Sequence, residues 1–450
     1  MKKFRILAAI LAAAILCVGA VGFAACGDNG GDDNGGGGGT IVGGGNDDGG
    51  TTPSTTTYQY DITMWVGEGT DTITAQMIND FNSSTDTSVN PGFKFNATIE
   101  IQSESTAAGN ATSKPADCAD IYCIAQDQLA RCVNSQVCQS LNSTSTSFVE
   151  STMSSTAVDA AKVGNVLYAF PMTLDNAYFL YYDTSVISEQ DVGSLNAILT
   201  DCKNANKNFS MNLTSNGAWY DMSFFLGTGC YSNWTTNENG QFTGYEDNIT
   251  SGSSAAYAAL KGIQLVTNSG CYSSSAEASE LTAGTPSAAL VSGIWSYNAA
   301  KTNLGDNFGV AVLPEFTVAN QTYQMKTYLG SKMMCVKPQD DTYKALGLQY
   351  LARYLTSAEC QMTRFNEVGW GPSNTSAAEQ ATGSAALDVL NKEIEQGITV
   401  AQGQFPTNWW SVMALLAGSA KDDTTFTDAN YNVMLTTYQN SLNALVNATS

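Results

Sequence analysis

The chain contains no histidine, and few of its residues are charged. Without an imidazole it cannot build a Ser–His–Asp or Cys–His nucleophilic site, a His-ligated zinc centre or an HExxH protease. Charged residues make up 13% of the chain, about half of the roughly 25% that is usual in globular proteins. An enzyme made from this chain would depend on carboxylates, Tyr, Lys or Cys, so the composition favours a binding protein.

Basic residues are also scarce: 19 Lys and Arg stand against 41 Asp and Glu, a formal net charge of −22. Nucleic acids and anionic lipid surfaces bind proteins through clustered Lys and Arg, so neither is expected as the main partner. The chain does have length and apolar content. Its 450 residues are 43% hydrophobic, enough for a sizeable core in one large two-lobed unit or in about three average domains.

The first 26 residues have the form of a secretory signal peptide. Three basic residues open it, and an uncharged apolar run from Ile6 to Ala25 leads to Cys26. Phe23-Ala24-Ala25-Cys26 resembles a bacterial lipobox, in which the Cys is lipidated and becomes the new N-terminus. We therefore expect cleavage of residues 1–25 and anchoring of the protein through Cys26 to the outer face of the cell membrane. The alternative is an uncleaved helix of about 20 residues that spans the membrane once.

The segment after Cys26 cannot form a core, because residues 27–57 hold 13 Gly and five Asp and end in a Thr-rich stretch. We interpret residues 26–57 as the lipidated Cys and a flexible linker with a reach of roughly 30 Å. Its Gly runs are not phosphate-binding loops, since no strand precedes them and no helix or Lys follows them.

From Tyr58 onward the pattern is that of an α/β protein. Tyr58–Val66 and Phe93–Ile101 alternate apolar and polar residues as strands do, and Asp120–Ile124 is a short apolar strand. The interleaving of these strands with helices predicts a largely parallel sheet. Helices are predicted after a cap at Thr70 or Asp71, with the apolar stripe Ile73, Met77, Ile78 and Phe81, and at Gln126–Ser135, Ala255–Thr267, Tyr343–Leu355 and Tyr431–Val446.

Two turns of the predicted sheet carry carboxylates. Glu68 and Asp71 follow the first strand beside Trp65, and Asp127 follows the strand that ends at Ile124. Ligands of open α/β sheets bind at the carboxyl ends of the strands. Sugar hydroxyls donate and accept hydrogen bonds, so sugar sites combine carboxylates with flat aromatic rings. The alternative is structural, with Asp71 as a helix cap and Asp127 as the partner of a helix dipole.

The later tryptophans also stand in positions that are often exposed in a cleft. Trp219, Trp295 and Trp370 follow turns or Gly, and the Trp409-Trp410 pair follows Pro406. Burial in an ordinary core is the alternative for each ring, because Trp is usually mostly buried.

The order of segments resembles that of the extracellular solute-binding proteins of sugar ABC transporters, in particular the maltose- and maltodextrin-binding group. The resemblance covers about Asp61 to Val446 with the spacing kept. It is carried, in order, by ITMWVGEGTDTITAQMINDFN, ADCADIYCIAQDQLARCVNSQ, GNVLYAFPMTLDNAYFLYYDTSVI, AALVSGIWSY, DNFGVAVLPEF with MKTYLGSKMMCV, GWGPSNTSAA and FPTNWWSVMALLAGSA.

This resemblance implies an α/β, two-lobed periplasmic-binding-protein-like fold, with a hinge of crossing segments and a ligand cleft between the lobes. Residues 58–171 and 328–368 would form lobe 1, and residues 172–327 and 369–450 would form lobe 2. The lobes would close on an oligosaccharide, most simply maltose or maltodextrin, and the closed monomer would deliver it to the permease subunits of an ABC importer. No enzymatic activity, cofactor or metal is expected, and no EF-hand-like loop is present.

Carried over position by position, the resemblance also implies a set of ligand-binding residues. In the first lobe and at the hinge these are Trp65, Glu68, Asp71, Asp127 and Asp175. In the second lobe they are the stacking residues Trp219 or Tyr220, Trp295, and Trp409 or Trp410. Family members often have a basic residue after the first turn and another beside the position of Asp127. Here Gln128 occupies the second place and no Lys lies near Glu68.

Two other functions remain open at this point. A carboxylate-based extracellular glycosidase would need two carboxyls across a sugar, for which Asp127 and Asp175 are the candidates. A surface adhesin is supported only by the Gly-rich linker.

Nine cysteines remain besides Cys17 and Cys26, and their odd number leaves at least one free thiol. Disulfide pairs such as Cys118–Cys123 or Cys230–Cys271 are one alternative. The other is that all nine thiols are buried and free. The absence of CxxC disfavours structural zinc and thioredoxin-like chemistry.

Overall fold

The computed structural model describes residues 57–213, 218–251, 253–421, 426–427 and 429–449. The predicted signal peptide, the predicted lipidation site Cys26 and the linker up to residue 56 lie outside these residues. Within the described part of the chain, no helix has the length and apolar character needed to cross a membrane.

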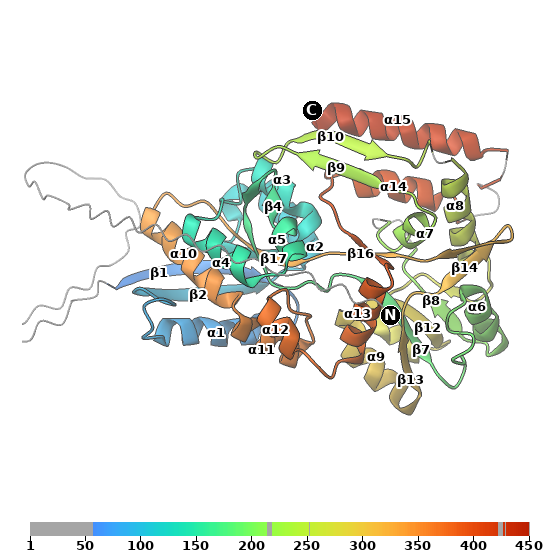
Figure 1. Cartoon of the computed structure of the whole chain (residues 1–450), viewed down its shortest axis with the longest axis horizontal. Helices are drawn as coiled ribbons and strands as arrows, with labels where there is room; N and C mark the ends of the chain where they lie inside the picture. The colour runs from blue at the N-terminus through green and yellow to red at the C-terminus, as the bar shows by residue number, and fades with distance from the viewer. Residues whose placement is uncertain (1–56, 214–217, 252, 422–425, 428, 450) are drawn as a thin grey trace, which may run out of the picture. The chain divides into compact units, whose positions relative to one another are not determined.

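Five strands form the first sheet, in the order β2-β1-β3-β17-β6. Figure 1 shows its strands β1 and β2 side by side. β1 (Tyr58–Val66) pairs in parallel with β2 (Phe93–Ile101) and β3 (Ile121–Ala125). β17 (Lys332–Val336) runs antiparallel to β3 and to β6 (Ala169–Pro171). The first three strands are parallel, but the predicted largely parallel sheet is wrong, because both pairings of β17 are antiparallel. The third strand begins one residue later than its predicted start at Asp120.

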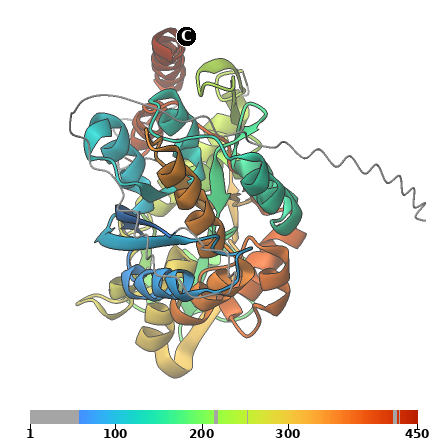
Figure 2. The same cartoon turned by 90° about the vertical axis from the view of Figure 1, so that its left-hand side faces the viewer.

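Helices and a small ribbon accompany this sheet. α1 and α10 lie side by side (Figures 1 and 2), and the rings of Phe81 and Tyr354 join them at a centroid distance of 5.7 Å. The elements are α1 (Asp71–Ser83), α2 (Glu104–Ser113), η1 (Pro115–Asp117), η2 (Gln126–Gln128), α3 (Leu129–Asn134), α4 (Ser143–Thr152), α5 (Ser155–Ala160), β4 (Lys162–Val163), β5 (Val166–Leu167), α10 (Thr342–Leu355), α11 (Ala358–Val368) and α12 (Thr375–Gln380).

α1 follows its predicted stripe, but not its predicted cap. Met77, Ile78 and Phe81 are buried, whereas Ile73 is only half-buried. Thr70 occupies the N-cap position without a side-chain capping bond. Its hydroxyl donates instead to the Gly67 carbonyl at 2.8 Å, because the tight turn after β1 brings that acceptor closer than the helix N–H groups. The side chain therefore fixes the turn and not the helix end.

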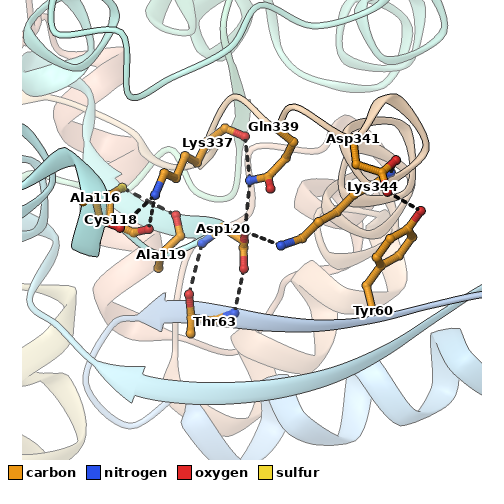
Figure 3. Close-up of polar contacts among 10 residues, drawn as sticks. All are labelled: Tyr60, Thr63, Ala116, Cys118, Ala119, Asp120, Lys337, Gln339, Asp341 and Lys344. Atoms are coloured by element: carbon orange, nitrogen blue, oxygen red, sulfur yellow. Dashed lines mark hydrogen bonds and ion pairs between the residues drawn. The ribbon is translucent and has the colours of Figure 1, made fainter. Parts of the chain in front are cut away.

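A polar network ties the returning chain to the first parallel strands (Figure 3). The Asp120 carboxylate accepts the backbone N–H of Thr63, the amide of Gln339 and the ammonium of Lys344, each at 2.9 Å. Lys337 Nζ donates to two backbone carbonyls just before β3, at 3.2 and 3.1 Å. Charge-assisted bonds of this kind hold the segment that follows β17 against the residues just before β3.

The second sheet has the strand order β11-β8-β12-β7-β13. β7 (Tyr178–Asp183) runs antiparallel to β12 (Ser287–Gly293) and β13 (Phe308–Ala311), while β8 (Asn208–Ser210) runs parallel to β12 and β11 (Tyr272–Ser273). Its helices are α6 (Leu195–Asn204), α7 (Met222–Gly227), α8 (Ser253–Thr267), η3 (Ala278–Thr282), η4 (Ile294–Ser296), α9 (Tyr297–Leu304), η5 (Gly305–Asn307), α13 (Ala385–Glu395), α14 (Trp409–Gly418) and α15 (Tyr431–Thr449).

Each sheet has its own hydrophobic core. We call the buried cluster that includes Phe81 and Tyr122 the first core, and the cluster that includes Tyr178 and Phe209 the second core. Every residue of β7 is buried, and alternate side chains enter the second core and a smaller third cluster that includes Tyr181. A strand covered on both faces is typical of the centre of an α/β sheet. The molecule thus has two α/β halves.

Three segments of the chain cross between the two sheets and pair with one another. The segment from β6 to β7 forms backbone bridges with the other two, at Asn176–Gly330 and at Thr173–Pro372. Asn176 and Gly330 exchange both backbone hydrogen bonds, at 3.1 and 3.0 Å. These crossing segments are the hinge of the fold.

Four short pairings complete the topology. β9 (Ser232–Thr236) and β10 (Phe242–Asp247) form a hairpin, as do β14 (Glu315–Val318) and β15 (Gln321–Gln324). β16 (Thr327–Leu329) pairs in parallel with β18 (Thr399–Ala401), and β4 pairs with β5.

All nine cysteines of the described residues are buried and unpaired. The considered pairs Cys118–Cys123 and Cys230–Cys271 are not formed, which leaves buried free thiols. Burial raises the pKa of Cys118 and Cys123 to about 12, so these thiols stay protonated and unreactive at neutral pH.

Candidate ligand-binding site

A cavity of about 680 Å³ opens where β1, β2 and β3 end, beside the crossing segments. This volume lies within the range of natural small-molecule sites, about 300–1,000 Å³. Segments attached to both sheets line it: Glu68, Ser103, Glu104, Ser105, Ala125, Asp127, Gln128, Asn176, Trp219, Glu277, Trp295, Lys332, Trp370, Gln402 and Trp410.

Four indole rings reach the cavity. Trp219 precedes α7, Trp295 follows β12, Trp370 follows α11 and Trp410 lies in the first turn of α14. The rings of Trp219 and Trp295 lie 5.9 Å apart with their planes tilted by 35°, and Trp295 is 41% exposed. An exposed pair of flat apolar faces is suited to pyranose rings or to an organic cation.

Two glycines make room for this wall. A Cβ atom at Gly293 would lie 2.1 Å from the ring of Trp295, and one at Gly67 would lie 2.1 Å from Glu104 Oε1 and 3.1 Å from the ring of Trp370. Any larger residue at either position would push the neighbouring side chain out of place. These glycines therefore allow the indole of Trp295 and the carboxylate of Glu104 to lie against the backbone.

Four carboxylates line the cavity, and they differ in burial. Glu68 and Glu277 are exposed, Glu104 is half-buried, and Asp127 is 6% exposed. Asp127 Oδ2 accepts hydrogen bonds from Trp410 Nε1 at 3.0 Å and from Gln128 Nε2 at 2.9 Å. Burial raises the pKa of Asp127, and these two donors oppose the rise. Asp127 thus joins the end of β3 to the start of α14 across the cavity.

One lysine lies among these groups. Lys332, the first residue of β17, is 7% exposed, and its Nζ lies 3.8 Å from Asp175 Oδ1. The same Nζ lies 4.2 Å from the ring centre of Trp370 and 5.9 Å from that of Trp295, distances at which an ammonium group is attracted to an indole face. Asp175 Oδ2 accepts the backbone N–H of Gly371 at 2.6 Å. This hydrogen bond joins the crossing segment between β6 and β7 to the crossing segment that follows α11.

Gln402 contributes a buried acceptor. It is 7% exposed, it lines the cavity, and its Oε1 has no hydrogen-bond partner among the described residues. Its backbone carbonyl accepts from Gln126 Nε2, which holds the segment before α14 against the end of β3. This oxygen lies against the backbone of Gly330, and a buried acceptor without a donor is costly.

Five of the side chains that the sequence proposes for the site line the cavity: Glu68, Asp127, Trp219, Trp295 and Trp410. They come from the ends of β1, β3 and β12 and from the starts of α7 and α14. The structure therefore brings together residues that lie up to 342 positions apart in the chain.

The other proposed residues do not line the cavity. Trp65 donates its indole N–H to Glu100 at 3.0 Å and packs against Tyr122 of the next strand, since its side chain faces along the sheet. Asp71 is half-buried at the start of α1. Asp175 is fully buried, with its carboxylate engaged behind the wall by Gly371 and Lys332.

The remaining two are aromatic rings of the second core. Tyr220 is 9% exposed and packs on Tyr178 at 4.8 Å. Trp409 is fully buried, stacks on Phe405 at 4.0 Å and donates to Ser232 Oγ at 3.1 Å. In the pairs Trp219/Tyr220 and Trp409/Trp410 the structure thus turns one ring to the cavity and the other to the core.

The sequence did not single out several lining residues as ligand contacts. Trp370 stands between two glycines, and the sequence indicates that its ring is exposed in a cleft without including it among the ligand-binding residues. Glu104, Glu277, Lys332 and Gln402 carry no local pattern, because the crossing segments and long loops bring them to the cavity. Within the described residues, no three His, Cys, Asp or Glu side chains are grouped closely enough to hold a metal ion.

Comparison with known proteins places the chain in a family. The model of the family described as "Bacterial extracellular solute-binding protein" matches residues 76–391. No curated protein sequence matches the chain.

Solved structures resemble the whole described body. The maltodextrin-binding protein of L. casei BL23 without ligand has a TM-score of 0.71 and 18% identity, covering 85% of this chain and 99% of its own. The maltose/maltodextrin-binding domain of Bdellovibrio bacteriovorus, bound to maltotriose, has a TM-score of 0.67 and 16% identity over 85% of this chain and 100% of its own. The GacH receptor of Streptomyces glaucescens GLA.O, known unliganded and with acarbose, has a TM-score of 0.67 and 16% identity, with coverages of 87% and 99%. The predicted two-lobed fold with a hinge and a cleft is confirmed.

Proposed function

Because the chain belongs to the family of bacterial extracellular solute-binding proteins, we propose that it is a lipid-anchored receptor that captures an oligosaccharide and delivers it to an ABC importer. Membership in this family makes the chain a binding protein rather than an enzyme. The oligosaccharide, for which maltose or maltodextrin is our first choice, the anchor at Cys26, the permease partner and the monomeric state are parts of the proposal.

The observation that carries the proposal is the composition of the cavity wall. Four indoles stand beside carboxylates and amides in a cavity of about 680 Å³, and groups from both sheets contribute. Flat apolar faces suit sugar rings, and acceptor-rich polar groups suit their hydroxyls. Similar structures are named for maltodextrin, maltotriose and acarbose, which agrees with a saccharide ligand.

Closure of the two halves on the ligand would be a population shift. A saccharide in the cavity would touch Asp127 on the first half and Trp295 on the second at the same time only when the halves are close. Such a ligand stabilises the closed state through contacts that the open state lacks. The closed state would then be the form that the permease binds.

Lobe boundaries follow from the same proposal. We assign residues 58–171 and 328–368 to lobe 1, and residues 172–327 and 369–450 to lobe 2. The strands of the first sheet all come from the first set and those of the second sheet from the second set, which supports the division. Trp370 belongs to the second set but packs in the first core, as a residue next to a hinge would.

The glycosidase alternative loses its candidate pair. Asp175 does not line the cavity, and it lies 3.8 Å from the ammonium of Lys332. A carboxylate next to a lysine behind the wall cannot face Asp127 across a sugar as the paired carboxyls of a glycosidase do.

A thermal-shift screen of the chain from Tyr58 onward against a panel of neutral and amine-bearing oligosaccharides tests the proposal. Binding to the folded state raises the melting temperature in proportion to the logarithm of ligand concentration over Kd. We expect the melting temperature to rise with a maltodextrin. We also expect mass spectrometry of the protein purified from membranes to show a covalent lipid on Cys26. If no oligosaccharide raises the melting temperature, the receptor function is refuted. If Cys26 carries no lipid, the proposed anchor is refuted.

A further inference from the structure

The carboxylates of the cavity lack positive partners. Glu68, Glu104, Asp127 and Glu277 line it, and none of them belongs to an ion pair among the described residues. Lys332 is the cation among the lining residues, and it lies 3.8 Å from the buried Asp175. The lysine therefore offsets a carboxylate behind the wall, and the four carboxylates on the wall remain without a counter-charge.

These carboxylates are not arranged as the ligands of a metal ion. No group of three or more acidic, Cys or His side chains in the described part of the chain is close enough to hold one. The charges are instead spread around a cavity of about 680 Å³. A spread of acceptors fits an extended organic ligand that donates hydrogen bonds at several points.

Acceptors without donors recur on the same wall. Glu104 Oε1 and Gln402 Oε1 are buried, and neither has a hydrogen-bond partner among the described residues. Gln402 itself is 7% exposed, so its free oxygen belongs to a side chain that is held in place by packing. These oxygens lie against Gly67 and Gly330, so a ligand donor reaches them only if the two side chains turn toward the cavity. A buried acceptor without a donor costs free energy, and a charged donor would give the stronger bond.

The indoles of this cavity already accept an ammonium group. Lys332 Nζ lies 4.2 Å from the ring centre of Trp370 and 5.9 Å from that of Trp295. Trp219 and Trp410 offer two further rings beside the same carboxylates. Indole faces next to carboxylates attract a partly desolvated cation by about 0.5–2 kcal/mol per ring.

We infer that the ligand is a saccharide that carries a protonated amine, and that the carboxylates of the cavity bind this amine in preference to a neutral hydroxyl. The inference rests on the proposed saccharide-receptor function and narrows its ligand class. Each of its parts has a place: the sugar rings lie on the indoles, and the ammonium lies beside Glu68 or Glu277, the two exposed carboxylates of the wall. The absence of a basic residue near Glu68 and the presence of Gln128 beside Asp127 agree with it.

Matched ligand pairs test the inference with the full-length protein in detergent. One pair is maltotriose and a maltotriose in which one C6 hydroxyl is replaced by an amine. The second is triacetylchitotriose and its deacetylated, cationic form. We expect the amine to bind at least about tenfold more tightly in one pair at about 20 mM salt, and this ratio to shrink at about 500 mM salt because the charges are screened.

Variants on the rim of the cavity locate the effect. Glu68 and Glu277 are exposed, so the double variant Glu68→Gln/Glu277→Gln should fold normally. It should lower the ratio of the affinity for the amine to the affinity for the neutral sugar to within about twofold, whatever the change in the affinity for the neutral sugar itself. Glu150→Gln, an exposed change on α4 outside the cavity, should leave the preference intact.

The outcomes separate this inference from the proposed function. Equal affinity for both members of each pair would overturn the inference and leave the saccharide receptor standing. A preference that survives the double variant or high salt would also overturn it, since the amine would then be recognised elsewhere. Failure of every saccharide, neutral or cationic, to bind would overturn the receptor function itself and the inference with it.

Discussion

The cavity wall and the core directly behind it are built from the same residue types, but they use them differently. Trp409 and Trp410 are adjacent in α14, yet Trp409 is fully buried on Phe405 and Trp410 lines the cavity and donates to Asp127. Glu393 is fully buried in the second half, whereas Glu68 and Glu277 are exposed on the wall. Successive residues of a helix point about 100° apart, so one turn of α14 serves both regions.

In this molecule the core residues provide stability, and the residues of the cavity wall provide binding. Core groups have close apolar neighbours, and their loss leaves a void. Wall groups keep exposed faces, such as the 41% exposed indole of Trp295, that only a ligand can cover. Substitutions behind the wall should therefore change the free energy of unfolding, and substitutions on it should change affinity.

Trp409→Ala should have the largest effect. Its indole is fully buried and stacked at 4.0 Å on Phe405, so removal leaves a cavity and should lower the free energy of unfolding by about 3–5 kcal/mol. Chemical denaturation followed by fluorescence measures this loss. Trp410→Ala is the matched control one residue away, and we expect it to lose less than about half as much. Equal losses for the two variants would show that the wall and the core are not distinct.

Trp295→Ala and Asp127→Ala should come next, and they should act on binding. Each removes a contact with the saccharide from one of the two halves, so affinity should fall by about a hundredfold, or about 2.7 kcal/mol. Because Trp295 is 41% exposed, its loss should leave the melting temperature of the ligand-free protein within a few degrees. Isothermal titration with the best saccharide from the screen provides the affinity. Unchanged affinity in both variants would refute the proposed site.

The pH dependence of stability should reveal the buried acid of the core. Burial raises the pKa of Glu393 to about 8, while Leu313 N donates to its Oε1 at 2.8 Å. Between pH about 4.5 and about 8 the folded state keeps a proton that the unfolded state has lost, so stability should fall as pH rises through this window. One proton corresponds to a slope of about 1.4 kcal/mol per pH unit.

Glu393→Gln is the test of that slope. Glutamine keeps an acceptor for Leu313 N but cannot ionise, so the difference in unfolding free energy between variant and parent should grow from pH 5 to pH 8. Denaturation at both pH values gives the two differences. A constant difference would mean that Glu393 ionises normally in the folded protein.

The sequence predicted the regular elements well and the orientation of side chains less well. Strands β1 and β2 have the predicted bounds, and α10 and α15 start within one residue of the predicted positions, because period-two and three-to-four patterns persist over many residues. The short segment Gln126–Ser135 is instead a 3₁₀ turn followed by α3, since so few residues give no clear period. Pattern length thus set what could be predicted.

The site could be predicted only in part, for a related reason. The turns after β1 and β3 place Glu68 and Asp127 at a sheet edge, which sequence order alone indicates. The choice between Trp409 and Trp410 depends on the exact rotation of α14, and the pairing of Lys332 with Asp175 depends on how two crossing segments meet. Both features depend on the tertiary structure, and no local sequence pattern predicts them.

Gly293→Ala should have the smallest effect and give the finest test of the wall. The φ angle of Gly293 is −95°, which alanine adopts without strain, so only contacts matter. The new Cβ would lie 2.1 Å from the ring of Trp295 and 2.6 Å from the backbone oxygen of Ala177, so both the indole and the local backbone must move. We expect affinity for the saccharide to fall by about threefold to tenfold and the free energy of unfolding to fall by about 1–3 kcal/mol. Because Trp295 itself is retained, such a loss would show that the position of the ring, and not only its apolar area, governs binding. An unchanged affinity would mean that the exposed indole is free to adapt and that its placement by Gly293 has no part in recognition.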